Sequence, residues 1–234
     1  MKKSVVVLIL AIIWLCSCGQ RSKSITGKVS VDSEIVDSTN NHKSQRTLIS
    51  VLDKFIYTDT TYASSTGKGI TIQNSYPKGG SIAPGGIQYF DSSGKRHAFV
   101  VFWTRIINET TTPLELTINF PADSLAIFTP PDSYLKLFLP TDTITIDKLL
   151  KFNYGLTGAK SFIDTNFNKA TKLQKTIQPN EKYFFYVAAL SFKAGGTTRG
   201  GLILKEQDLY YKLGIEPHGY GIIPCGQLVM KTSK

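Results

Sequence analysis

The alternation of apolar and polar residues is clearest between residues 97 and 120. Over 97–107 the residues are apolar on both alternating faces of a strand, so this strand must be covered on both sides. Residues 114–120 alternate strictly between apolar and polar, which predicts a strand with one face in water. The polar segment 108–113 between them predicts a hairpin on which the rest of the fold packs, with Trp103 in the core.

Similar short patterns predict further strands from residue 69 to the end of the chain. They cover residues 69–73, 87–90, 125–128, 134–139, 201–205, 209–213 and 227–230. Residues 173–177 and 183–192 predict a second hairpin, closed by a turn at Pro179 and Asn180. Residues 143–152 and 156–163 predict short helical or irregular insertions, and adjacent apolar pairs over 47–57 predict a short amphipathic helix.

Short strands separated by glycine and proline turns predict an all-β fold, a β-sandwich formed by a single domain over residues 47–234. No repeat of about 20–50 residues is visible, which argues against solenoids and propellers. The succession of a strand, a polar turn with proline and an aromatic strand resembles immunoglobulin-like domains of exported bacterial proteins. The resemblance implies an immunoglobulin-like β-sandwich. Because the Cys, Trp and Cys signature of antibody domains is absent, it implies no antibody-like function.

The start of the chain has the composition of an export signal. Met1, Lys2 and Lys3 are followed by eleven apolar residues over 5–15. A helix that crosses a bilayer needs about 20 apolar residues, so this stretch is too short for a permanent span. Residues 1–17 are therefore expected to be a signal peptide.

Leu15 and Ser17 precede Cys18 with the spacing of a lipobox. In this segment the chain resembles the precursors of bacterial lipoproteins. The resemblance implies a diacylglyceryl thioether on Cys18, cleavage before this residue and acylation of the new amino group. Cys16 fits the pattern poorly, because bulky Trp14 and Leu15 would lie next to the cut. The alternative is an ordinary secretory signal with a chance cysteine.

Gly19 stands where many lipoproteins of the inner membrane carry a retaining aspartate, so the resemblance favours the outer membrane. The domain would then face either the periplasm or the cell surface. The following residues up to position 46 are polar and nearly free of aromatic side chains. Such a segment cannot bury enough apolar surface to offset its ordering entropy, so residues 18–46 are expected to be a flexible tether.

The charge of the chain bears on its partners. It has 27 basic and 17 acidic residues, and loss of Lys2 and Lys3 with the signal peptide leaves 25 and 17, a net charge of +8. A basic exported protein favours anionic surfaces such as lipid headgroups or acidic glycans. Nucleic acid is a poor partner, because an exported and tethered protein rarely meets it and no run of five like charges is present.

The loop predicted over residues 74–86 is the most distinctive local stretch, because it is rich in glycine and proline. The spacing of a phosphate-binding loop is missing from it. Its candidate binding residues are Tyr76, Lys78, Gly79 and Gly80. The glycines let a partner approach the backbone closely, and the ammonium group of Lys78 can meet an acidic group.

No catalytic or metal-binding residues are predicted, and no cofactor is expected. Two Ser-x-x-Lys matches, at Ser65 and Ser92, lack the partner motifs of penicillin-binding enzymes. The three histidines lie more than fifty residues apart, and the aspartates lack the spacing of a calcium loop, although a spatial cluster of them is an alternative. Cys225 is expected to be a buried residue of a late strand, and Arg199 an exposed residue of a hairpin loop.

These observations predict a membrane-anchored lipoprotein of the bacterial cell envelope that acts as a non-enzymatic binding or structural module. Its partners would be the membrane, through Cys18, and an envelope protein or an anionic glycan or lipid. One alternative is an inhibitor or immunity-type lipoprotein that blocks a hydrolase through a rigid, protruding loop. Another is an envelope hydrolase of unrecognised type, which a deep pocket with two carboxylates would indicate.

Overall fold

The computed structural model describes residues 51–63, 69–127, 131–217 and 219–231 of the chain. Most of these residues belong to strands, which form two antiparallel sheets. The predicted signal peptide over residues 1–17 and the whole predicted tether over residues 18–46, with the lipidation site Cys18, lie outside the described residues. Within them, no helix is long and apolar enough to cross a membrane.

In the described part of the chain, the first sheet has eight strands and the second has five. The first sheet contains β1 (Ile56–Tyr62), β2 (Ile70–Ser75), β3 (Lys78–Gly79), β4 (Tyr89–Phe90), β5 (Arg96–Asn108), β7 (Leu125–Ile127), β8 (Ser133–Phe138) and β10 (Lys182–Phe192). The second contains β6 (Leu114–Phe120), β9 (Thr171–Ile177), β11 (Thr197–Lys205), β12 (Asp208–Glu216) and β13 (Gly219–Met230).

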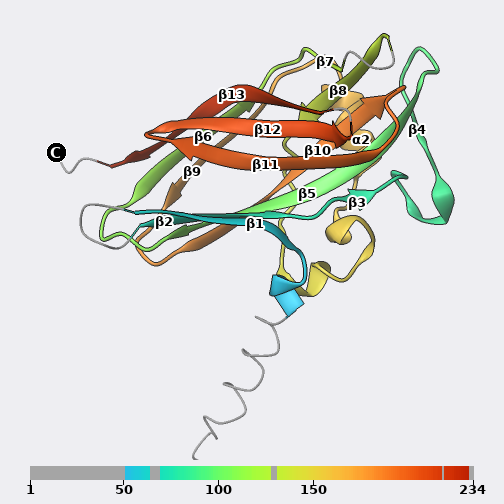
Figure 1. Ribbon diagram of the computed structural model, residues 1–234. Helices are drawn as coiled ribbons and strands as arrows, with labels where there is room; N and C mark the ends of the chain where they lie inside the picture. Colours follow the sequence, from blue (N-terminus) through green and yellow to red (C-terminus); the bar gives the residue numbers. More distant parts are fainter. Residues whose placement is uncertain (1–50, 64–68, 128–130, 218, 232–234) are drawn as a thin grey trace, which may run out of the picture. The chain divides into compact units, whose positions relative to one another are not determined.

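The strands of the first sheet follow the order β1-β2-β5-β10-β8-β7, and the two short strands β3 and β4 also pair with β5. The second sheet follows the order β11-β12-β13-β6-β9. Figure 1 shows the sheets as two layers, with β11, β12 and β13 in front of β5 and β10. The predicted all-β class, with two antiparallel sheets, is therefore confirmed, whereas the immunoglobulin-like β-sandwich stays a prediction.

The central strand β5 is buried on both faces, as its sequence predicted. Val100, Phe102 and Ile106 belong to the core between the two sheets. Phe99 and Trp103 point the other way, into a second core on the outer face of the first sheet. Trp103 is fully buried there. A strand with two apolar faces thus lies where both faces are removed from water.

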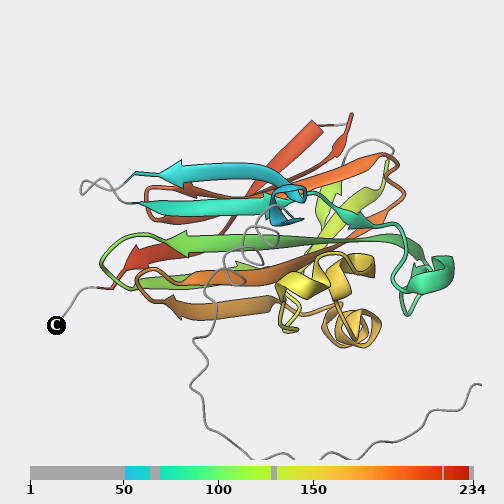
Figure 2. The same ribbon diagram turned by 90° about the horizontal axis from the view of Figure 1, so that it is seen from below.

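The second core is covered by the segment between β8 and β9, where the predicted short helices are found. They are η2 (Ile146–Lys148), η3 (Phe152–Gly155) and α2 (Ala159–Asn166). Buried side chains from this segment, including Leu149, Tyr154 and Ile163, pack with the outer face of β5 and β10. In Figure 2 the segment (yellow) lies beside these two strands. The helical insertion therefore serves as a third layer.

Both predicted hairpins are wrong, because in each case the two strands belong to different sheets. β5 pairs with β2 and β10, whereas β6 pairs with β13 and β9. The link between β5 and β6 is organised by Asn108, whose side-chain amide donates to the carbonyls of Thr112 and Ile177 at 2.9 and 3.1 Å. Its carbonyl oxygen accepts from the backbone N–H of Thr110 at 3.0 Å.

The second link, between β9 and β10, crosses between the sheets at the same place. The backbone N–H of Asn180 donates to the carbonyl of Asn108 at 2.7 Å, and Asn108 N–H donates to the carbonyl of Glu181 at 3.0 Å. The Pro179–Asn180 turn therefore reverses the chain from one layer to the other. A buried asparagine ties both crossings together, which the local pattern of each strand pair could not reveal.

Three boundaries also differ from the predictions. Helical structure at the start of the domain is described only at residues 51–53, and the chain enters β1 at Ile56, so the helix predicted over 47–57 does not extend to its end. The predicted loop 74–86 begins as strand, because Asn74 and Ser75 complete β2. Arg199 lies within β11 and not in a hairpin loop.

Candidate functional site

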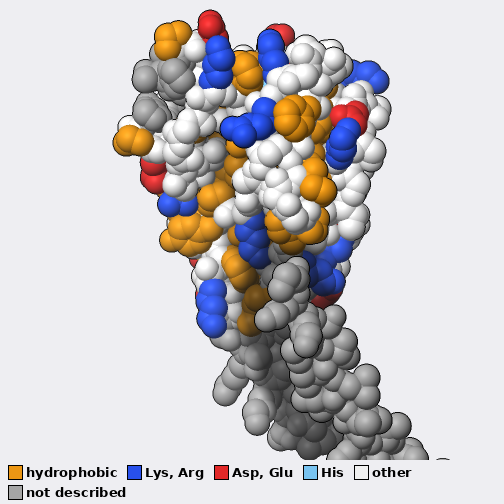
Figure 3. All heavy atoms as spheres, turned by 90° about the vertical axis from the view of Figure 1, so that its right-hand side faces the viewer, with side chains coloured by type: hydrophobic (Ala, Val, Ile, Leu, Met, Phe, Trp, Pro, Cys, Tyr) orange, Lys and Arg blue, Asp and Glu red, His pale blue; other side chains and the backbone are white. Residues whose placement is uncertain are grey.

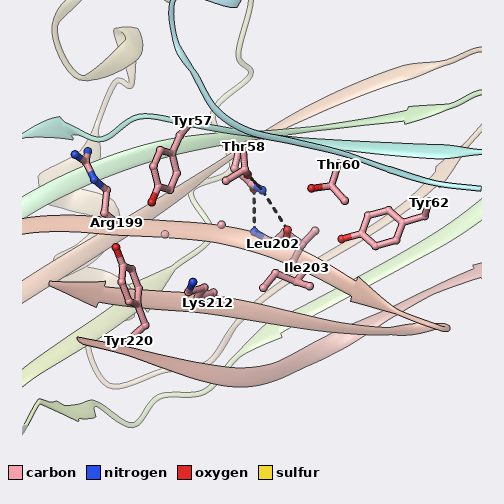
Figure 4. A pocket seen from close by; sticks show the side chains of 12 residues that line it. Tyr57, Thr58, Thr60, Tyr62, Arg199, Leu202, Ile203, Lys212 and Tyr220 are labelled. Atoms are coloured by element: carbon pink, nitrogen blue, oxygen red, sulfur yellow. Dashed lines mark hydrogen bonds between the residues drawn. The ribbon is translucent and has the colours of Figure 1, made fainter. Parts of the chain in front are cut away.

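The candidate site is a groove between β1, the edge strand of the first sheet, and β11, the edge strand of the second. It encloses a cavity of about 290 Å³. Side chains from β1, β11, β12 and β13 surround it (Figure 4). The lining residues are Tyr57, Thr58, Thr60, Tyr62, Asn74, Arg199, Gly200, Gly201, Leu202, Ile203, Lys212 and Tyr220. The groove thus lies where the edge strands of the two sheets come close to each other without pairing.

Asn74 on β2 holds the two edges together at the floor of the groove. Its side chain accepts a hydrogen bond from the N–H of Leu202 at 2.9 Å and donates to the carbonyl of the same residue at 3.1 Å. It also donates to the hydroxyl of Thr58 and accepts from that of Thr104, both at 2.9 Å. One buried amide therefore takes the place of a strand partner for β11.

Gly201 of β11 makes this close approach to Asn74 possible, while its neighbour Gly200 lies against Tyr211 of the same sheet. A Cβ atom at Gly201 would lie 2.9 Å from the Asn74 amide nitrogen, and one at Gly200 would lie 3.0 Å from the ring of Tyr211. Further along, the N–H of Leu204 donates to the Tyr62 hydroxyl at 3.1 Å. The edge of β11 is thus bonded by side chains from the first sheet, and the spaces beside these bonds form the groove.

One end of the groove carries a cluster of aromatic rings and cations. The guanidinium of Arg199 lies 5.3 Å from the ring centre of Tyr57 and 5.6 Å from that of Tyr76, and these two rings are 5.3 Å apart. The ammonium group of Lys212 lies 4.4 Å from the ring centre of Tyr220. Cations over aromatic faces are attracted by the quadrupole of the ring, so the cluster keeps its cations beside the rings.

Glu216 is the acid of this cluster, and its carboxylate is already engaged. Nε of Arg199 donates to it at 3.2 Å and the hydroxyl of Tyr220 donates to it at 2.6 Å. The hydrogen bond from Tyr220, followed by the charge of Arg199, lowers the pKa of Glu216, while the same hydrogen bond raises the pKa of Tyr220. At neutral pH the tyrosine is therefore a protonated donor and the glutamate an ion.

The groove combines surfaces that suit a ring-shaped ligand with an acidic group. Tyrosine rings provide flat apolar faces, the hydroxyl groups of Thr58 and Thr60 provide polar contacts, and Arg199 and Lys212 provide positive charge. No lining residue is an acid, and the nearby carboxylate of Glu216 is engaged by Arg199 and Tyr220. Concave sites of this kind, with a few polar groups among aromatic side chains, are typical of ligand-binding sites.

The four predicted binding residues of the loop over 74–86 have different surroundings in the structure. Tyr76 is 43 % exposed and contributes its ring to the cation cluster beside the groove. The Lys78 ammonium instead donates to the carbonyls of Leu149 and Lys151 at 2.6 and 3.0 Å, so its charge is used within the fold. Gly79 pairs with β5, and a Cβ there would lie 2.2 Å from the carbonyl oxygen of Phe99. Gly80 has open space around it.

Two other residues that could take part in catalysis, a histidine and a cysteine, are buried in the fold. The imidazole of His97 is buried, with Nδ1 at 2.9 Å from the Lys95 carbonyl and Nε2 at 2.8 Å from the hydroxyl of Tyr134. Burial lowers the pKa of His97. Cys225 is buried in β13, as predicted, and burial raises the pKa of its thiol to about 12, which keeps it from forming a thiolate at neutral pH.

Among the described residues, no three His, Cys, Asp or Glu side chains come together in a way that could hold a metal ion. The candidate site residues that the sequence did not indicate are Arg199, Lys212, Tyr57 and Tyr220. Their one sequence signal is the glycine pair at positions 200 and 201, where the strand predicted over 201–205 begins, since glycine in a strand indicates a close backbone approach. No family model matches the chain, and no curated protein matches it either.

Proposed function

We propose that the protein is a membrane-anchored lipoprotein of the cell envelope, held at the outer membrane by acylated Cys18. Its β-sandwich is a non-enzymatic module that binds an anionic glycan in the groove between β1 and β11. The anchor is supported by the lipobox spacing of Leu15, Ser17 and Cys18. The proposal that the ligand is an anionic glycan is supported by the residues of the groove. The anchor and the ligand are tested separately.

One observation supports an anionic glycan as the ligand. The cations of Arg199 and Lys212 lie beside the rings of Tyr57, Tyr76 and Tyr220. A guanidinium has five N–H donors, and Glu216 accepts from Nε. The two terminal nitrogens suit the paired oxygens of a carboxylate or phosphate. A sugar ring can lie against tyrosine while its acidic substituent meets Arg199. A neutral sugar would lack the second interaction.

Replacing Arg199 by glutamine is expected to weaken binding of an oligosaccharide of uronic acids about tenfold or more, because a charge-assisted hydrogen bond contributes about 1.5–3 kcal/mol. The acylated full chain is titrated in detergent with labelled polyuronate oligosaccharide, and the neutral sugar of the same length serves as the competitor. Lys205→Gln is the matched control. Lys205 also lies on β11 with its ammonium over an aromatic ring, that of Tyr210, but outside the groove.

Equal binding of the neutral and acidic sugars, or equal losses in the two variants, would contradict the proposed ligand class. Turnover of the oligosaccharide by the purified chain would contradict the non-enzymatic part and favour the envelope-hydrolase alternative. The inhibitor alternative keeps one observation in its favour. Ile87 and Phe90, on the segment between β3 and β5, are 56 % and 52 % exposed, as a protein-binding loop would require.

Cys18→Ala is expected to abolish incorporation of labelled fatty acid and leave an unprocessed or soluble chain, because the modified thiol and the new amino group both belong to this residue. Cys16→Ala is the control and is expected to be labelled and processed normally. The measurement is metabolic labelling followed by membrane fractionation. Labelled fatty acid on the Cys18→Ala chain would show that the anchor lies elsewhere.

A further inference from the structure

The segment over the second core carries an exposed apolar surface that neither the groove nor the fold uses. Leu150 is 70 % exposed, which makes it the most exposed large hydrophobic side chain of the described chain. Phe152 is 44 % exposed and Ile146 38 %. We call residues 145–155, which include η2 and η3, the apolar lobe. Grouped exposed apolar side chains of this kind mark surfaces that meet a partner or a membrane.

The apolar lobe is built so that these side chains face outward. Leu149 and Tyr154 are fully buried and attach the lobe to the second core. The Lys78 ammonium donates to the carbonyls of Leu149 and Lys151, which lie on either side of Leu150. The partly buried ammonium of Lys78 therefore holds the backbone on both sides of Leu150, whose side chain is left in solvent.

The backbone beside Phe152 is also held in an unfavourable conformation. Asn153 and Tyr154 follow it with φ values of 46° and 53°, in the left-handed region that is rare for a bulky residue such as tyrosine. The side chain of Asn153 donates to the carbonyl of Ser81 at 3.1 Å, and the Tyr154 hydroxyl donates to that of Tyr76 at 2.7 Å. These bonds stabilise a turn that leaves Phe152 in solvent.

The apolar lobe lies at the end of the domain where the described chain begins. The ring of Phe55, four residues after the first described residue, Val51, is 5.7 Å from the ring of Tyr154. The Lys78 ammonium lies 4.7 Å and 4.5 Å from these two ring centres. Cys18 precedes Val51 by 33 residues. The described chain therefore begins beside the apolar lobe.

The side of the domain seen in Figure 3 presents hydrophobic patches between lysine and arginine side chains, with few acidic side chains in view. Within the lobe, Lys148 and Lys151 flank the exposed apolar residues and pair with Asp142 and Asp147. The two ion pairs make the lobe nearly neutral, so its attraction to a surface rests on its apolar side chains, while the net charge of the chain favours an anionic one.

We propose that the apolar lobe docks on the lipid surface to which Cys18 is attached, with Leu150 and Phe152 inserted at the boundary of headgroups and acyl chains. The proposal rests on the anchor of the proposed function but not on the glycan. A few apolar side chains alone bind a bilayer only marginally. A domain linked to the same bilayer by about thirty residues has an effective concentration near the millimolar range, at which a weak contact suffices.

Docking would orient the domain instead of leaving it to float. Without docking, a flexible tether of about thirty residues, as the sequence predicts, would let the anchored domain move roughly 30 Å from the bilayer. With the apolar lobe on the lipid, the groove between β1 and β11 is presented at a defined side of the molecule. The orientation therefore decides which envelope component can reach the groove.

The test places the acylated full chain in vesicles of phosphatidylethanolamine and phosphatidylglycerol that contain a photo-crosslinking phospholipid. Crosslinks are mapped by mass spectrometry. Residues 146–155 are expected to be crosslinked, and Leu150→Asp combined with Phe152→Asp is expected to reduce these crosslinks about tenfold. The matched control is Ile222→Asp combined with Met230→Asp, which changes two similarly exposed apolar residues of β13 and should leave them unchanged.

Each other outcome overturns the proposal in a recognisable way. Crosslinks confined to residues 18–50 would mean that the anchor holds but the lobe does not dock. Crosslinks to neither region would mean that the anchor itself is wrong. Crosslinks at residues 146–155 that persist in the double variant would mean that the lobe is not what holds the domain there. Self-association of the acylated chain in detergent that the double variant abolishes would identify a second copy as the occupant of the lobe.

Discussion

Replacing Trp103 by alanine is expected to lower the free energy of unfolding by about 3–5 kcal/mol, the cost of removing a large aromatic side chain from a packed interior. The side chain is fully buried in the second core, 5.7 Å from the ring of Phe184. Typical domains are stable by about 5–15 kcal/mol, so this is a large share of the total. For a domain of this size the melting temperature should fall by about 6–20 °C.

Trp103→Phe separates packing from hydrogen bonding. The indole N–H of Trp103 has no hydrogen-bond partner among the described residues, so its loss removes no bond. The phenylalanine variant should therefore lose less than half as much stability as the alanine variant. Both are measured by urea denaturation of the full chain. A loss below about 1 kcal/mol for Trp103→Ala would contradict the placement of this residue in a packed core.

Asn74→Ala is expected to cost about 2–4 kcal/mol and to abolish binding in the groove. The variant removes hydrogen bonds to Leu202, Thr58 and Thr104 and leaves the N–H and carbonyl of Leu202 without their partner. Net contributions of about 0.5–1.5 kcal/mol for each bond, and a further cost for buried groups left unpaired, give this range. The measurements are urea denaturation and titration with the acidic oligosaccharide.

Gln73→Ala is the matched control for this prediction. Gln73 precedes Asn74 on β2 and donates to Asp59 of β1 at 2.8 Å, but it does not line the groove. Because Asp59 is exposed, water replaces this bond when the amide is removed, so the replacement should cost about 1 kcal/mol or less and leave the affinity for the oligosaccharide unchanged. If the two variants were equally stable, or if Asn74→Ala bound the ligand normally, the side-chain connection between β2 and β11 would not be what forms the groove.

The individual strands could be predicted because burial imposes a pattern on each of them separately. The strict alternation of residues 114–120 is realised in β6, whose Leu114 and Phe120 face the core between the sheets. The two apolar faces of residues 97–107 required two covering layers, and β5 has them. The short helices between β8 and β9 were also predictable from their mixed pattern.

Strand pairing could not be predicted in the same way. A hairpin and a crossing between two sheets can join the same two strands, and the polar link between them satisfies either arrangement. The crossing arrangement is stabilised by Asn108. This residue bonds to Thr112 in the link between β5 and β6, and to Ile177 and the backbone of Asn180 at the link between β9 and β10. The contacts with Ile177 and Asn180 join residues about seventy positions apart, so no local window of sequence contains them.

The groove was missed for a related reason. Its cations and rings come from β1, β11, β12, β13 and the residue after β2, and they meet only when the two sheets stack. Arg199 therefore looked like an exposed loop residue, whereas the structure places it against two tyrosine rings. Lys78 shows the opposite case, since a charge that seemed available to a partner is used inside the fold.

By itself, the sequence determined most of the strands, though not β1 or β3, together with the all-β class, the central position of residues 97–107 and the buried sites of Trp103 and Cys225. Hydrophobic burial is local in its signature, because side chains alternate along each strand whatever its neighbours are. Only the tertiary structure decided which strands pair, where the edges stay open and which charged groups face solvent. Those outcomes depend on hydrogen bonds between residues far apart in the sequence, such as Asn74 and Leu202. The periodicity of a single strand does not indicate such partners.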